Sequence, residues 1–237
     1  MKYLEKFLKR KLNKDGSLYF CLSVVRSRPL AFITTCLYSS YYTKRLTGKL
    51  WPIVVRFRGK LVPLTISVKS ANVVTEGNLI IESWQNGTAP ISIALGRGSK
   101  FAIEGDFIIG QGVKIAVSDG ATLSLGGRKH STGSGITCDS IIMVRSRVEI
   151  GADVIISWGV FITDSDWHKI NGAEDVLPVQ IGDNVWISHD ASILKGVKIG
   201  AGSIVGAKSL VIGSVPERCL VGGAPAKIIR ENVSWSR

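Results

Sequence analysis

Branched aliphatic residues recur every six positions over the second half of the chain, and this period restricts the fold more than any other feature. The lead positions are Ile103, Ile109, Ile115 and Ala121, then Val144, Ile150, Ile156 and Ile162, then Ile181, Ile187, Ile193, Ile199, Val205 and Val211. Four positions after each of these 14 leads, ten residues are apolar and two are serines. A period of six is neither the 3.6 of a helix nor the 2 of a simple strand. It predicts short strand segments joined by turns.

Units of this kind cannot bury their inner faces alone, so we expect them to stack into a solenoid. A β-sandwich would not keep one phase through the six units from Ile181 to Val211. Glycines follow several lead positions, where we expect turns that would strain a side chain. They are Gly110, Gly151, Gly182, Gly200 and Gly206. The sequence predicts an all-β domain over residues 71–231, with less regular first coils and a small loop at 126–135.

The N-terminal region differs from this domain in charge. Residues 1–70 contain 15 Lys and Arg against Glu5 and Asp15, whereas residues 71–237 contain 15 against 16 acidic residues. This asymmetry predicts an anionic partner for the N-terminal region. No recognition motif accompanies the basic residues, so we expect no nucleic-acid partner.

Residues 1–15 have the pattern of a short basic amphipathic helix within a partly helical region 1–70. Its apolar residues recur at three- and four-residue spacing, and they are Tyr3, Leu4, Phe7, Leu8 and Leu12. Peripheral contact with an anionic membrane and packing against the protein's own body fit this pattern equally well. No signal peptide is evident, and the uncharged run at 29–43 is too short to span a bilayer. We expect a cytoplasmic protein. If residues 1–15 contact a membrane, we expect the protein to be peripheral at its inner face.

The six-residue period breaks at "TDSDWHKINGAEDVLPVQ" (163–180). The lead position after Ile162 falls on His168, and the period resumes at Ile181, 13 residues after His168. We count this interval as one six-residue unit plus seven extra residues. Loops that leave a rigid scaffold commonly carry function. Imidazole can accept a proton from a hydroxyl nucleophile, and a carboxylate can orient it. Asp164 and Asp166 are the candidates for that role, and we prefer Asp166 because its position is otherwise apolar; an ordinary surface turn is the alternative.

Residues 178–231 resemble the C-terminal half of the hexapeptide-repeat acyltransferases, which include galactoside, maltose, xenobiotic and capsule or lipopolysaccharide O-acetyltransferases. The stretches "IGDNVWI" and "VGGAPAKIIR" carry the resemblance most specifically. With the loop at 163–180, it covers roughly residues 90–231 and leaves residues 1–70 outside. It implies a left-handed parallel β-helix, triangular in section, that assembles as a homotrimer.

The resemblance also implies an acetyl-CoA-dependent O-acetyltransferase acting on a saccharide hydroxyl, with His168 as the general base. The basic N-terminal region favours a lipid-linked saccharide, such as a capsule or O-antigen intermediate, as the acceptor. The CoA groove would lie between adjacent prisms, and the positions that match it are His189, Ala207, Lys227, Arg230 and, beside them, Trp186. Cations there suit the phosphates of CoA. This chain has Ile212-Gly213 where family members often carry Thr-Lys, and "WISHD" for "WIG", so the phosphate contacts and the role of His189 stay open.

Three alternatives remain. N-acetylation of an amino sugar would use the same donor and base. A zinc-dependent hydratase of the gamma-carbonic-anhydrase kind would need three imidazoles, and this chain has His130, His168 and His189, whose spacings of 38 and 21 do not resemble that family. The third is a non-catalytic assembly module. The four cysteines are scattered and indicate reduced thiols, so we expect no metal site.

Overall fold

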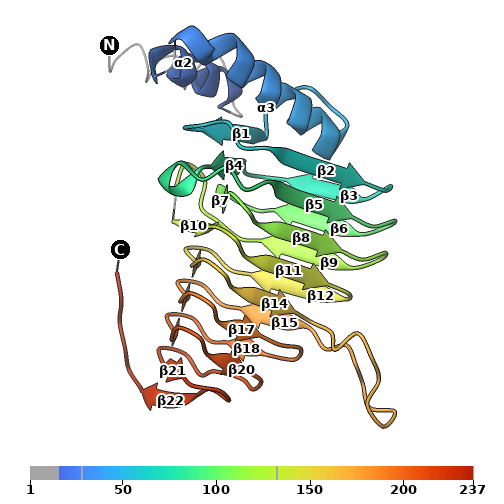
Figure 1. Ribbon diagram of the computed structural model, residues 1–237, viewed down its shortest axis with the longest axis vertical. Helices are drawn as coiled ribbons and strands as arrows, with labels where there is room; N and C mark the ends of the chain where they lie inside the picture. Colours follow the sequence, from blue (N-terminus) through green and yellow to red (C-terminus); the bar gives the residue numbers. More distant parts are fainter. Residues whose placement is uncertain (1–15, 28, 132, 237) are drawn as a thin grey trace.

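The structure, a computed structural model, describes residues 16–27, 29–131 and 133–236. The amphipathic helix expected over residues 1–15 lies outside these described residues. Coils of parallel strands stack along one long axis, with helices at one end and the C-terminal strand at the other (Figure 1). In the part of the chain described, no helix is long and apolar enough to cross a membrane.

Each coil contributes one strand to each of three parallel sheets, which form the three faces of a prism. Face 1 contains β1 (Val55–Arg58), β4 (Leu79–Glu82), β7 (Phe107–Gly110), β10 (Ser134–Ile136), β13 (Ile155–Ile156), β16 (Trp186–Ile187), β19 (Ile204–Val205), β21 (Leu220–Gly222) and the antiparallel β22 (Lys227–Arg230). Face 2 contains β2 (Leu64–Val68), β5 (Ile91–Leu95), β8 (Lys114–Val117), β11 (Ile141–Val144), β14 (Phe161–Thr163), β17 (Ser192–Ile193) and β20 (Leu210–Val211). Face 3 contains β3 (Asn72–Thr75), β6 (Lys100–Ile103), β9 (Thr122–Leu125), β12 (Arg147–Ile150), β15 (Val179–Ile181) and β18 (Lys198–Ile199).

The prism confirms the predicted fold class, an all-β parallel β-helix of hexapeptide coils with a short helical N-terminal region; its left hand rests on the resemblance. All 14 residues at the expected lead positions are buried. Each coil stacks its inward aliphatic residues on those of the next, so the core runs along the whole axis. The chain turns at three corners, called here corner 1–2, corner 2–3 and corner 3–1 after the faces they join.

Two expected leads, Ala121 and Val144, are buried but do not occupy the register position of the other leads. The residue in register with Ile103 is Leu125, not Ala121. Val144 pairs with Val117, and the residue in register with Ile115 is Ile142. The cause is segment length, because Ile142 and Ile150, which occupy the register position on successive faces, are eight residues apart.

The glycines after the lead positions are required for close approach between coils rather than for left-handed backbone. A Cβ atom on Gly151 would lie 2.5 Å from an Asp183 side-chain oxygen, and one on Gly200 would lie 2.4 Å from the Glu217 nitrogen. The small residue therefore lets one coil settle directly on the next at the corner.

The helical region comprises α2 (Ser17–Ser27), η1 (Pro29–Ala31) and α3 (Phe32–Thr47), and a further turn, η2 (Trp84–Asn86), follows β4. The prism begins at Val55, inside the segment expected to be the N-terminal region, because β1 and β2 already pair with β4 and β5. All four cysteines are free thiols. The Cys21 and Cys36 sulfur atoms lie 3.5 Å apart between α2 and α3, and burial, together with Cys21, raises the pKa of Cys36 to about 12.

Candidate active site

The interruption of the repeat is a hairpin-like loop at corner 2–3. Ile162 lies in β14 on face 2, and Ile181 lies in β15 on the next face. All 13 extra residues are therefore inserted at one corner, and the expected division into one unit plus seven residues was wrong. The loop closes on itself through an antiparallel bridge between Ser165 and Val176. It projects from the side of the prism (Figure 1).

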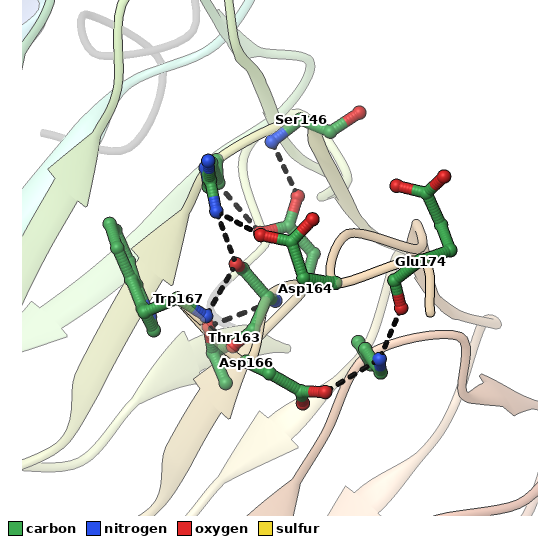
Figure 2. A network of polar contacts seen from close by, with 10 residues as sticks. Ser146, Thr163, Asp164, Asp166, Trp167 and Glu174 are labelled. Atoms are coloured by element: carbon green, nitrogen blue, oxygen red, sulfur yellow. Dashed lines mark hydrogen bonds and ion pairs between the residues drawn. The ribbon is translucent and has the colours of Figure 1, made fainter. Parts of the chain in front are cut away.

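Asp164 fixes the start of the loop to the coil that precedes it. Its side chain is fully buried, and its carboxylate accepts backbone N–H bonds from Arg145 at 2.7 Å, Ser146 at 2.7 Å and Arg147 at 2.6 Å (Figure 2). These three amides form the same corner one coil earlier. A carboxylate satisfies them more strongly than a neutral acceptor would.

Lys195 fixes the loop to the coil that follows it. Its ammonium group lies 2.6 Å from the Asp166 carboxylate and also donates to the Glu174 carbonyl. Figure 2 shows Asp166 and Glu174 on the two arms of the loop, linked through this one cation. The loop is thus held at its base from both neighbouring coils.

Asp175 forms the third anchor, an ion pair with Arg145. The Asp175 side chain is nearly buried, and its backbone oxygen accepts a hydrogen bond from the Asp166 N–H at 2.8 Å. Burial raises the pKa of Asp175, but the hydrogen bond and charge of Arg145 outweigh it and hold the pKa below its ordinary value of 3.8. The carboxylate therefore stays charged, and paired, through neutral and mildly acidic pH.

We expect this pair to stabilise the fold in a pH-dependent way. Because the pKa is lowered in the folded chain, the stabilisation is full above 3.8 and is lost as the pH falls through the lower folded value. The difference in Tm between the unmodified chain and Asp175→Asn should be largest near neutral pH and should shrink below 3.8. Thermal unfolding of both chains across acidic pH measures it, and a difference that does not change with pH would contradict this account.

His168 lies near the tip of the loop and is exposed. The residue before it, Trp167, has a φ of 64°, a left-handed conformation that bulky side chains rarely adopt. Its N–H donates to the Ser165 hydroxyl at 2.9 Å. Backbone strain of this kind concentrates at functional sites. The loop therefore holds a left-handed turn immediately before the exposed imidazole of His168.

The structure does not bring either expected carboxylate to His168. Both oxygens of Asp164 are occupied by backbone amides, and Asp166 pairs with Lys195. In the described residues His168 has no hydrogen-bond partner. The orienting role expected for Asp164 or Asp166 is thus replaced in this structure by a role in holding the loop.

The other predicted residues gather at corner 1–2 and on face 1. His189 stacks on Trp158, with ring centroids 5.2 Å apart and planes 7° from parallel. Ala207 is exposed one coil further along the same corner. The Trp186 indole on face 1 lies 3.4 Å from the Ser157 hydroxyl and 6.0 Å from the Trp235 ring.

The two predicted cations lie at the C-terminal end of face 1. Lys227 and Arg230 are both exposed on β22, which pairs antiparallel with β21. They therefore lie on the same face as Trp186. The whole width of face 2 separates this group from the loop that carries His168.

The three histidines lie at three different corners of the prism. His130 is exposed between β9 and β10 at corner 3–1, His168 lies at corner 2–3, and His189 at corner 1–2. In the described part of the chain, no three His, Cys, Asp or Glu side chains are grouped to hold a metal ion. The tetrahedral imidazole set of a zinc hydratase cannot form from one copy of this chain.

Sequence reasoning missed the residues that hold the loop and the partner of His189. Arg145 and Lys195 belong to the coils before and after the loop, and Trp158 belongs to the coil before His189. The signal that could have predicted these contacts is the coil register, which sets which residues lie above one another in adjacent coils. Positions above one another across the insertion differ by 31 residues, as Ile162 and Ile193 do, and the same step links Trp158 to His189.

Comparisons with known proteins agree with this geometry. Residues 178–213 match the family described as Bacterial transferase hexapeptide (six repeats). Over 144 residues the chain is 33% identical to the polysialic acid O-acetyltransferase of Escherichia coli O1:K1 / APEC, covering 57% of this chain and 42% of that protein. Over part of its length the chain is thus similar to hexapeptide-repeat acetyltransferases.

A second relative is WbbJ of Escherichia coli strain K12, which carries the provisional name of a lipopolysaccharide biosynthesis O-acetyl transferase. It is 37% identical over 98 residues, covering 35% of this chain and 50% of WbbJ. The chain thus spans half or less of the length of these curated relatives. Among solved structures, the polysialic acid O-acetyltransferase OatWY aligns with a TM-score of 0.48 and 22% identity, over 77% of this chain and 91% of that one.

Proposed function

We propose that this chain is an acetyl-CoA-dependent O-acetyltransferase that acetylates a saccharide hydroxyl, with His168 as the general base. The observation that carries the proposal is the anchored loop, which interrupts a rigid prism at one corner to expose a single imidazole. The relatives named for polysialic acid and lipopolysaccharide O-acetylation support a saccharide acceptor. N-acetylation of an amino sugar uses the same base and is the second candidate.

His168 would take the proton of the acceptor hydroxyl as its oxygen attacks the thioester carbonyl of acetyl-CoA. Backbone N–H groups would stabilise the oxyanion of the tetrahedral intermediate. Collapse of that intermediate breaks the carbon–sulfur bond, and the imidazolium returns the proton to the departing CoA thiolate. The exposed Lys227 and Arg230 would bind the CoA phosphates.

The proposed site needs a second copy of the chain. His168 projects from corner 2–3, whereas His189 and Ala207 lie at corner 1–2, across face 2. A cyclic trimer would place corner 2–3 of one prism beside corner 1–2 of the next, so that each site takes its base from one copy and its CoA groove from another.

A mixed oligomer tests both parts of this proposal. His168→Ala and Ala207→Trp, the second of which would block the groove, should each lower transfer of labelled acetyl from acetyl-CoA to saccharides by about 10²-fold or more. Co-expressed in equal amounts, they should regain about a quarter of the unmodified activity, since a quarter of shared sites then combine two intact halves. No recovery would show that each site lies within one chain, and no transfer by the unmodified protein to any saccharide or amino sugar would refute the enzyme itself.

A further inference from the structure

Helix α3 packs against the prism through a row of hydroxyl groups as well as through Leu46 near its C-terminal end. Thr35, Ser39 and Thr43, spaced four residues apart, are all buried. The Thr43 hydroxyl accepts the backbone N–H groups of Val54 and Val55, and the Ser39 hydroxyl accepts that of Phe57. These hydroxyls occupy amides of β1, the strand at the edge of face 1, which no further strand covers.

The opposite side of the same helix is apolar and open to solvent. Ile33 is 68% exposed, Leu37 64% and Tyr41 55%, and Leu30 in the preceding turn η1 is fully exposed. These four residues are called here the outer face. Ile33, Leu37 and Tyr41 are also spaced four residues apart, two positions out of step with the buried hydroxyls. A helix on a soluble domain normally shows the reverse arrangement, with its apolar stripe against the core. The outer face therefore lacks the apolar partner that its composition requires.

The charge of the surrounding chain identifies the kind of partner. From Gly16 to Thr75 the sequence contains nine Lys and Arg residues and no Asp or Glu. Lys44 and Lys49, at the end of α3 and just beyond it, are both exposed. More apolar side chains are exposed nearby in the chain, with Leu50 at 56% and Trp51 at 49%. Aliphatic residues flanked by Lys, Tyr and Trp are the composition of segments that rest at the boundary between lipid headgroups and acyl chains.

We propose that the outer face docks on an anionic lipid bilayer. The helices form the end of the prism, so a flat surface can reach them without meeting the coils (Figure 1). The loop that carries His168 projects from the side of the prism toward the other end, and docking leaves it free (Figure 1). Basic residues would contact the acidic headgroups while the outer face enters the acyl boundary. The inference goes beyond the proposed acetyl transfer and does not depend on it.

Flotation with lipid vesicles tests the docking directly. The full chain should bind vesicles of phosphatidylcholine with about 30 mol % phosphatidylglycerol, and bind pure phosphatidylcholine at least about tenfold less. Ile33→Ser with Leu37→Ser should lower binding to the anionic vesicles by at least about tenfold. Ile212→Ser is the matched control, because Ile212 is 58% exposed near the opposite end of the prism, and it should bind as the unmodified chain does.

Circular dichroism and the mass in solution, measured for each variant, complete the test. Unchanged vesicle binding by the folded double variant overturns the proposal, as does equal binding to neutral and anionic vesicles. Loss of oligomer mass in the double variant, with vesicle binding retained, would instead make the outer face a contact between copies. Binding that disappears on removal of residues 1–15 but is unaffected by the double variant would place the membrane contact in that segment and also overturn it.

Discussion

His168→Ala is expected to lower the rate of acetyl transfer by about 10²–10⁴-fold while leaving the prism folded. The imidazole is exposed and makes no hydrogen bond in the described structure, so its removal costs the fold no contact. The base, however, is the only group proposed to take the proton from the acceptor. The loss should therefore appear mainly in kcat, because neither donor nor acceptor depends on this side chain for its binding.

His130→Ala provides the matched control, since His130 is also exposed on a loop between two coils. It should keep full activity, because corner 3–1 carries none of the proposed site. Steady-state rates with acetyl-CoA and an accepted saccharide, together with circular dichroism, distinguish a lost base from a lost fold. A folded His168→Ala chain with unmodified kcat would show that the chemistry lies elsewhere, and would favour an assembly module if no other residue could be found to act.

Asp164→Ala is expected to lower the free energy of unfolding by about 2–4 kcal/mol. Three backbone amides lose their acceptor, and a buried donor without a partner costs about 1–3 kcal/mol. The total is smaller than three such losses because Arg145 and Ser146 are exposed and water can reach part of the corner. For a chain of 237 residues the change corresponds to a fall in Tm of roughly 5–15 °C.

Asp166→Ala is the control variant, because it removes a partly exposed carboxylate of the same loop and leaves the buried Asp164 carboxylate in place. The Asp166 carboxylate also anchors the loop, but through a partly exposed lysine of the next coil, and such pairs contribute about 1 kcal/mol or less. Asp164→Asn should fall between the two, since one amide oxygen can still accept. Denaturant unfolding of the three variants orders them, and an Asp164→Ala chain as stable as Asp166→Ala would contradict the anchoring role.

The sequence predicted the core well because the inward positions of a coil obey a local rule. Ile109, Ile156 and Ile187 are buried for the same reason, and each can be found from its neighbours six residues away. The rule predicted the burial of Ala121 and Val144 but not their register, because the segments there are longer than six residues. It also missed β1 and β2, which lie before Ile103, where the regular six-residue spacing begins.

The site could be predicted only in part. His168 could be proposed because an interruption of a strict period is visible in the sequence alone. The supports of the loop were not, because Arg145 and Lys195 reach it from other coils, and their proximity depends on the stacking register rather than on sequence distance. For the same reason Asp164 resembled an orienting carboxylate until its buried amide partners were seen.

The hydroxyl groups of α3 also affect whether one prism can associate end to end with another. The strand at the open end of a stack of coils has unpaired backbone N–H and C=O groups, and these can pair with a strand of another molecule. Ser39 and Thr43 occupy those amides with side chains that offer no strand for continuation. The helix thus covers the edge of face 1, and a chain shortened to begin after α3 is expected to expose an unpaired strand edge that can pair with another chain.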